Sequence, residues 1–206
     1  RQRQMCIRDR PSSVTSIGDS AFKGCTNLIS IIIPNSVTSI GDSAFYNCTS
    51  LTNIIIPNSV TSIGDSAFSE CTSLTSIEIQ NSVTSIGDSA FYNCTSLTNI
   101  TLPFIGNGSN KTHFGYIFGA SYYDDNFKYV PTSLKKVIVT GGKSISDFAF
   151  FGCNCLTSIE IPNSVTSIGD SVFYNCTSLT SIIIPNSATS IGSSACLLYT
   201  SPSPRD

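Results

Sequence analysis

The chain has 206 residues, of which 40% are hydrophobic and 12% charged, and its formal net charge is −2. No apolar run approaches the roughly 20 residues that a membrane-spanning helix needs, which excludes a helical span within these residues. Nine cysteines raise the question of disulfides or a metal site.

The first and last segments differ from the rest of the chain. Residues 1–10 (RQRQMCIRDR) and 196–206 (CLLYTSPSPRD) resemble translated adaptor sequence from a sequencing library. A codon series for residues 5–9 has a reverse complement that encodes Cys-Leu-Leu-Tyr-Thr, which is what stands at residues 196–200. We therefore expect both segments to be foreign and the chain to be a fragment without either native terminus. The alternative is a basic N-terminal arm and a Ser/Pro tail.

Removing these ends changes the charge balance. Five of the 11 basic and two of the 13 acidic residues go with them, so 6 basic and 11 acidic residues remain, with a net charge of −5 and no arginine. This composition lacks the basic footprint of a nucleic-acid-binding protein.

Residues 11–195 consist of a 23-residue repeat, IPNSVTSIGDSAFYNCTSLTNII, with one interruption. The same residue type recurs at fixed positions: Val14, Val37, Val60, Val83 and Val165; Phe22, Phe45, Phe68, Phe91 and Phe173. A fixed period of this length predicts a solenoid in which each repeat is one coil stacked on the next. Ordering one coil costs on the order of 35 kcal/mol, more than its own apolar side chains return, so the coils must stabilise each other.

Each coil is expected to hold two short strands and a turn. The segment 51–56 (LTNIII) alternates and is bounded by Pro57, which predicts a strand. Seven such strands begin at Leu28, Leu51, Leu74, Leu97, Leu134, Leu156 and Leu179. The Ser-Val-Thr-Ser-Ile-Gly stretch predicts a second short strand, Gly41 permits a tight corner, and Asp42 is expected to cap one helical turn that carries Phe45 inward.

The recurring pattern L-x-x-I-x-I-P-x-S-V-T-x-I-G-x-x-A-F-x-x-C-x-x-L resembles the bacterial BspA-like, or Treponema-type, leucine-rich repeats. The resemblance covers residues 11–195 and implies a mostly β repeat solenoid, right-handed, with short helical turns and a parallel β-ribbon on its concave face. It also implies a secreted or surface-displayed bacterial protein of adhesin type. The family pattern contains no catalytic residues.

Two further residue types recur at fixed positions of the repeat. Cysteine recurs at one position and is expected to fill the core, with disulfides between coils or a metal site as alternatives, whereas Cys155 is expected to face solvent. Aspartate recurs at another position, where capping of the following turn competes with a row of calcium sites. The ladders are Cys25, Cys48, Cys71, Cys94, Cys153 and Cys176, and Asp19, Asp42, Asp65, Asp88, Asp147 and Asp170.

One insertion, at 103–133, adds 14 residues to a coil and concentrates aromatic residues beside the single histidine. Loops on a rigid scaffold often carry binding, so this insert is one candidate site. Its candidate residues are His113, Phe114, Tyr116, Tyr122, Tyr123 and Tyr129. The alternative is that these aromatics cover the coil edge at the break in the repeat. Catalysis by His113 with Asp124 or Asp125 would need a nucleophile and an oxyanion site that the sequence does not reveal.

The concave ribbon is the other candidate site. Strand alternation turns one side chain per coil outward beside the buried positions. These residues are Ile32, Ile55, Glu78, Thr101, Ile138, Glu160 and Ile183. Isolated isoleucines rimmed by Ser and Asn fit a protein partner, although the same residues are also tolerated on a solvated strand.

The sequence therefore favours a non-catalytic module that binds protein or glycan on host or bacterial surfaces and that lies outside the cell or on its surface. The alternative is a passive spacer that displays another domain. No phosphate-binding loop, zinc-ligand cluster or nucleophile elbow supports an enzyme, and no cofactor or metal site is expected.

Overall fold

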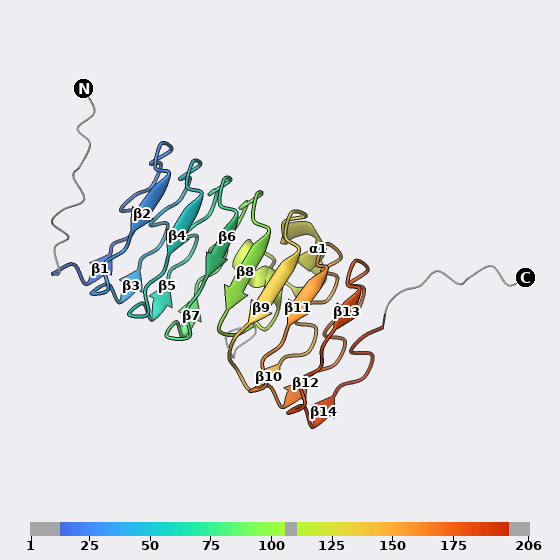
Figure 1. Ribbon diagram of the computed structural model, residues 1–206. Coiled ribbons are helices and arrows are strands. Elements are labelled where there is room, and N and C mark those ends of the chain that lie inside the picture. The colour runs from blue at the N-terminus through green and yellow to red at the C-terminus, as the bar shows by residue number, and fades with distance from the viewer. Residues whose placement is uncertain (1–12, 106–110, 198–206) are drawn as a thin grey trace, which may run out of the picture.

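The computed structural model describes residues 13–105 and 111–197, and within them the chain is a parallel β-solenoid (Figure 1). The segments assigned to adaptor sequence lie outside these residues, apart from 196 and 197. One strand per coil belongs to what we call the long-strand sheet, whose ladder is in two parts. In the first part β2 (Ser30–Ile32) pairs with β4 (Asn53–Ile55). The second part is formed by β6 (Ser76–Glu78), β8 (Asn99–Leu102), β9 (Lys136–Val139), β11 (Ser158–Glu160) and β13 (Ser181–Ile182). These are the seven strands predicted from the Leu-x-x-Ile-x-Ile segments.

The second strand of each coil forms the short-strand sheet. It contains β1 (Ser16–Ile17), β3 (Ser39–Ile40), β5 (Ser62–Ile63), β7 (Ser85–Ile86), β10 (Ser144–Ile145), β12 (Ser167–Ile168) and β14 (Ser190–Ile191). The pairings within this sheet are parallel and join residues 23 positions apart, as in Ser39 with Ser62. The repeat period therefore equals one full coil, as predicted.

The core is a set of columns that run along the solenoid axis. In one coil Val37, Ala44, Phe45, Cys48 and Leu51 all have 0% exposure. The phenylalanine column stacks ring on ring, with centroids 5.1, 5.3 and 5.5 Å apart and interplanar angles of 4° or less from Phe22 to Phe91. Each fully buried phenylalanine stabilises the fold by about 1.5–3 kcal/mol, and its ring contacts the phenylalanine rings of neighbouring coils.

The cysteine column is buried as predicted. Four of these thiols, those of Cys48, Cys71, Cys94 and Cys176, donate a hydrogen bond to the carbonyl oxygen of the phenylalanine in the preceding coil, for example Cys48 to Phe22 at 3.1 Å. Burial raises the pKa of the Cys48 thiol to about 11 and those of Cys71 and Cys176 to about 12. The prediction that Cys155 faces solvent is wrong, because its side chain is only 9% exposed and its thiol lies 3.4 Å from the carbonyl oxygen of Pro131.

The predicted helical turn after each aspartate does not form. Ser43 has a positive φ of 53°, which a right-handed helix cannot contain, and the amides of this turn bond to the next coil, as Phe45 does to the carbonyl of Ala67 at 2.7 Å. The aspartate does accept a backbone N–H, but that donor also lies in the next coil: Asp42 Oδ1 accepts the N–H of Asp65 at 2.8 Å. The ladder therefore joins coils and caps no helix.

The insert interrupts only one of the two sheets. The long-strand sheet continues from β8 to β9 with Asn99 paired to Lys136, whereas β7 and β10 belong to separate parts of the short-strand sheet. Between them the chain forms η1 (Phe114–Phe118), η2 (Tyr123–Asp125) and the short α1 (Asn126–Tyr129). Phe91 donates its N–H to Ile117 and Phe114 donates to Ala149, so the segment 114–117 takes the place of one turn in the stack.

A recurring glycine sets how closely the coils approach. A Cβ on Gly64 would lie 2.6 Å from the backbone nitrogen of Asp42 and 2.7 Å from the carbonyl carbon of Gly41, and Gly41 and Gly87 meet the same obstacle. At Gly18, in the first described coil, a Cβ would meet nothing within 4 Å. The glycine is therefore required by the preceding coil and not by the corner itself.

We expect Gly64→Ala to destabilise the protein by about 1–3 kcal/mol, because an added methyl group forces two backbones apart. Gly18→Ala is the matched control and should leave the free energy of unfolding within about 0.5 kcal/mol of wild type. Urea denaturation of the three proteins checks this. Equal losses in both variants would show that the corner conformation, and not coil spacing, demands glycine.

Candidate functional site

The seven candidate residues of the ribbon lie in one row on the outer face of the long-strand sheet, which we call the long-strand face. The strand register places Ile32 beside Ile55, and Glu78, Thr101, Ile138 and Glu160 in successive strands; Ile183 directly follows β13. The isoleucines differ in exposure: Ile32 is 51% exposed, Ile55 68% and Ile183 81%, whereas Ile138 is half-buried. The face thus presents aliphatic side chains at its two ends and polar ones in its middle.

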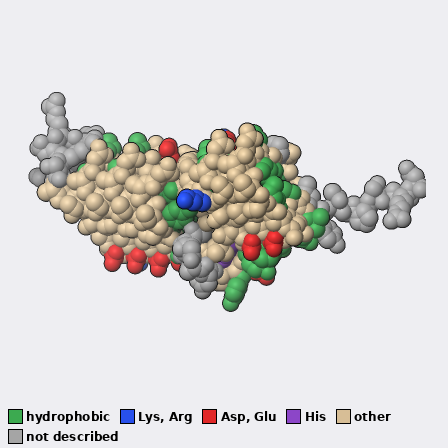
Figure 2. All heavy atoms as spheres, turned by 90° about the horizontal axis from the view of Figure 1, so that it is seen from below, with side chains coloured by type: hydrophobic (Ala, Val, Ile, Leu, Met, Phe, Trp, Pro, Cys, Tyr) green, Lys and Arg blue, Asp and Glu red, His purple; other side chains and the backbone are tan. Residues whose placement is uncertain are grey.

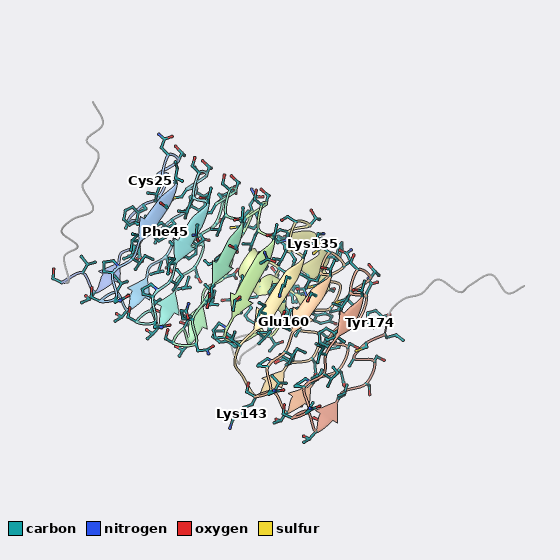
Figure 3. All side chains as sticks on the ribbon, in the orientation of Figure 1. Cys25, Phe45, Lys135, Lys143, Glu160 and Tyr174 are labelled. Carbon is teal, nitrogen blue, oxygen red and sulfur yellow. The ribbon has the colours of Figure 1, made fainter. Side chains whose placement is uncertain are left out.

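Charge on this face is sparse and partly neutralised. Lys136 Nζ lies 2.6 Å from Glu160 Oε1, which joins β9 to β11. Figure 3 shows Glu160 on β11. Glu78 occupies the equivalent repeat position on β6 and is exposed, and no ion pair involves it among residues 13–105 and 111–197.

The insert candidates separate into a buried and an exposed group. His113, Phe114 and Tyr116 are 4%, 2% and 8% exposed, so they cannot contact a partner on the surface. The exposed group is formed by Tyr122, Tyr123 and Tyr129, at 69%, 40% and 38%. Of the predicted insert site, only these three tyrosines remain available for binding.

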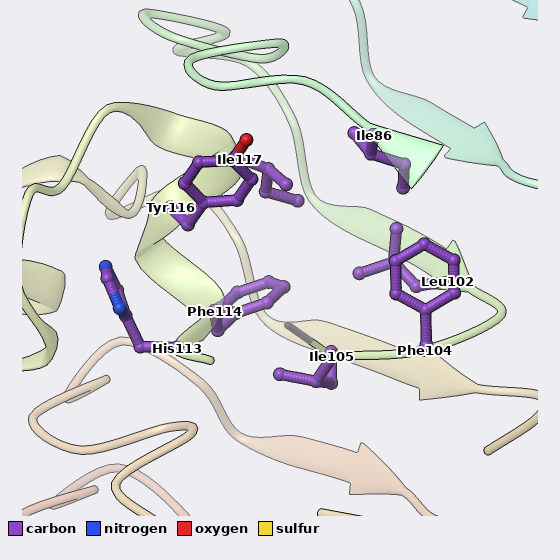
Figure 4. Close-up of a pocket in the computed structure, with 8 residues that line it drawn as sticks. All are labelled: Ile86, Leu102, Phe104, Ile105, His113, Phe114, Tyr116 and Ile117. Carbon is purple, nitrogen blue, oxygen red and sulfur yellow. The ribbon is translucent and has the colours of Figure 1, made fainter. Parts of the chain in front are cut away.

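The buried group packs against the solenoid core (Figure 4). His113, Phe114 and Tyr116 line a cavity of about 10 Å³ together with apolar residues such as Ile86 and Leu102. A cavity of this size barely holds one water molecule, so it is a packing gap and not a ligand pocket. The expectation that the aromatics cover the coil edge describes this group correctly.

His113 is held in its neutral form. Its Nε2 lies 3.0 Å from the carbonyl oxygen of Ala120, and because a carbonyl only accepts, that nitrogen carries the proton. Burial, helped by the nearby charge of Lys111, lowers the pKa of His113 below its ordinary 6.5 despite this hydrogen bond and the opposing charges of Asp88 and Asp124. The ring acts as a structural donor, and no candidate nucleophile contacts it among the described residues.

The insert also ends the aspartate ladder, a role that the sequence did not reveal. Asp88 would accept the N–H of an aspartate in a following coil, but the repeat stops here. Lys111 Nζ lies 3.2 Å from Asp88 Oδ2 and 5.0 Å from the ring centre of Tyr116, and Ser89 Oγ donates to Asp88 Oδ1 at 2.8 Å. A lysine and a hydroxyl thus replace the missing backbone donor. Figure 2 shows a row of acidic side chains along one edge of the solenoid.

Two further residues that the sequence reading missed fix the insert to the next coil. Asn126 is fully buried; its Oδ1 accepts the N–H of Gly115 at 3.0 Å and its Nδ2 donates to the carbonyl of Phe151 at 2.9 Å. Phe148 stacks on Tyr123 with ring centres 4.3 Å apart, although its φ of 56° is costly for a bulky residue. The sequence does mark Phe148 as unusual, because other repeats carry serine at this position.

The three exposed tyrosines do not form one flat platform. Tyr123 contacts Phe148 and Phe151, and Phe151 stacks in parallel on Tyr174 at 5.0 Å. Tyr129 instead packs toward Tyr92 on the preceding coil, 6.5 Å away between ring centres. The insert therefore extends aromatic contacts in both directions along the solenoid.

Asn126→Ala should destabilise the protein by about 2–4 kcal/mol, since the buried N–H of Gly115 and carbonyl of Phe151 both lose their partner. Asn154→Ala, at an exposed asparagine of the following coil, is the control and should change the free energy of unfolding by less than about 0.5 kcal/mol. Thermal and urea unfolding measure both. A loss below about 1 kcal/mol in Asn126→Ala would mean that water replaces the amide.

Acidification should weaken the fold through His113. Between pH 7.5 and 5.5 the unfolded histidine, with a pKa near 6.5, takes up a proton that the folded one resists, so the free energy of unfolding falls as the pH falls. His113→Gln keeps an N–H donor without the titration, and its stability should change less over this range. Parallel stability curves for the two proteins would contradict the assignment.

The described part of the chain offers neither a cluster of three metal-binding side chains nor a helix long and apolar enough to cross a membrane. The candidate binding surfaces are therefore the long-strand face and the exposed tyrosines of the insert.

Comparison with known proteins agrees with this architecture. Residues 8–116 and 121–201 match, in six copies, the family described as the BspA type leucine-rich repeat region. A leucine-rich repeat protein from Bacteroides ovatus is 32% identical with a TM-score of 0.60, over 91% of this chain and 51% of that one. The leucine-rich repeat protein of T. pallidum is 30% identical with a TM-score of 0.56, over 81% and 72% of the two chains.

A third solved structure, a leucine-rich repeat protein from Eubacterium ventriosum, is 27% identical with a TM-score of 0.59, over 81% of this chain and 42% of that one. The chain thus spans about half the length of two of these relatives, and no curated protein matches it. The repeat pattern, the solenoid and the family match agree, and the chain belongs to the BspA-type leucine-rich repeat family.

Proposed function

We propose that this chain is a non-catalytic binding module of an extracellular or cell-surface bacterial protein of adhesin type. It recognises protein or glycan partners with the long-strand face, and the exposed tyrosines of the insert form an accessory surface. The family match supports a repeat-based module, and the relatives described above are bacterial leucine-rich repeat proteins.

One observation carries the proposal: the insertion does not interrupt the long-strand sheet between β8 and β9. Residues 99–102 pair directly with 136–139, so this sheet continues across the interruption, while the short-strand sheet is broken at the same place. A passive spacer would tolerate a break in either sheet equally. Keeping these strands paired across the insertion is what a surface that contacts an extended partner requires.

The composition of the face supports a partner of low charge density. Ile32, Ile55 and Ile183 are exposed aliphatic side chains that a purely solvated ribbon does not need. Interfaces of this kind combine apolar contacts at their centre with a polar rim, and a few residues carry most of the binding energy. The isoleucines are therefore the expected anchors and the serines and asparagines the rim.

The protein should be tested against an array of matrix proteins, bacterial surface proteins and glycans. In the variant Ile32→Ser/Ile55→Ser, binding to the retained partner should weaken more than tenfold, because two buried aliphatic contacts are lost. Ile191→Ser is the control, since Ile191 is 55% exposed but lies on β14 of the other sheet.

The variant Tyr122→Ser/Tyr129→Ser tests the insert separately without removing its buried core residues. If binding falls only in this variant, the tyrosines are the main site and the long-strand face is not. The unmodified chain could also bind no protein or glycan of the array. That result would contradict the proposal and favour the alternative function, a spacer that displays another domain.

A further inference from the structure

The two glutamates of the long-strand face occupy the same position in their repeats but differ in electrostatic state. Glu160 is paired with Lys136 of the preceding coil at 2.6 Å. At the position of Lys136, the coil that precedes Glu78 carries Asn53, and the coil that follows carries Asn99. Glu78 is thus the one acidic side chain of this row, among those described, whose charge no lysine neutralises.

Glu78 also borders a hollow in the face. The hollow has a volume of about 270 Å³ and lies over β4, β6 and β8, with Asn53, Ile55, Ser76, Glu78 and Asn99 among its lining residues. The strand ladder is loosest here: the N–H of Thr75 lies 3.5 Å from the carbonyl of Thr52, against 2.9 Å between Thr98 and Thr75 one coil later. The hollow in the face therefore lies beside the unpaired carboxylate of Glu78.

The lining chemistry matches a cationic side chain. A carboxylate binds an ammonium or guanidinium group through short, charge-assisted hydrogen bonds, and the side-chain oxygens of Asn53 and Asn99 can accept further N–H groups. Ile55, which is 68% exposed, offers an apolar wall for the aliphatic stem of lysine or arginine. No lysine or arginine lines the hollow, so a phosphate or sulfate group would meet only repulsion from Glu78.

We infer that this hollow is a subsite for a lysine or arginine side chain presented by an extended segment of a protein partner, with Glu78 as its counter-charge. The inference rests on the proposed binding function and specifies the partner: a cation-bearing protein rather than a neutral glycan. The net charge of −5 over residues 11–195 favours the approach of such a partner and makes binding sensitive to salt.

The repeat supplies one variant that tests the charge without removing the carboxylate. Asn53→Lys should recreate beside Glu78 the pair that Lys136 forms with Glu160, and so block the subsite. Glu78→Gln removes the charge but keeps the size of the side chain. Glu160→Gln is the matched control at the equivalent position, where the charge is already neutralised.

The experiment pans a library of random heptapeptides displayed on phage against the whole chain at low salt. Enriched peptides are then synthesised with each arginine unchanged or replaced by citrulline, and each lysine unchanged or replaced by norleucine. We expect the enriched peptides to contain arginine or lysine, and their affinity to fall at least tenfold on Glu78→Gln, on Asn53→Lys and on replacement of the cation. Glu160→Gln should change the affinity less than twofold.

Enriched peptides that lack a cation, or that bind Glu78→Gln as tightly as wild type, would overturn this subsite. The proposed function would then stand or fall separately on the array and the isoleucine variants. A library that yields no enriched peptide also counts against the subsite. Absence of binding by the unmodified chain to any member of the array would contradict the proposed function as well.

Discussion

The contact between one coil and the next is the constraint on which the whole structure depends. In the regular repeats parallel strands pair residues 23 positions apart, and the same shift stacks phenylalanine on phenylalanine. Cysteine thiols donate to the phenylalanine carbonyl of the coil before, 26 residues earlier, as Cys71 does to Phe45. Glycine at Gly64 lets the backbones approach to a distance that no side chain would allow. Each coil supplies what its neighbour lacks, so stability grows with the number of interfaces.

A break in this repetition exposes groups that the stack would otherwise satisfy, and the insert is built to satisfy them by other means. Lys111 replaces the backbone donor missing from Asp88, and Phe114 and Phe118 continue the aromatic column at a tilt. Asn126 bonds the backbone of the insert to that of the following coil. The aromatic richness that singles out this segment therefore has two origins: closure of the solenoid core, and a smaller exposed remainder.

The rigidity of the stack fixes the positions of the side chains on the long-strand face. Because strand spacing and register are fixed by the core, the outward residues of successive coils form a regular row that varies only in side-chain type. Small differences along that row, such as a glutamate with or without a lysine beside it, then decide the local chemistry. A repeat scaffold can in this way hold different subsites at equivalent positions without any change of backbone.

The sequence by itself determined the solenoid, the two strands of each coil and the core positions of the regular repeats, because nearly identical repeats make the pattern of one coil the pattern of all. Only the tertiary structure decided where the non-repeating residues lie. Alternation says nothing about side-chain direction in the irregular segment 111–130, so the burial of His113 and the exposure of Tyr122 could not be predicted. The same holds for Cys155, buried by its coil neighbours, and for the aspartate ladder, whose donors lie in the next coil. Such contacts join residues far apart in the chain, and they exist only once the coils are stacked.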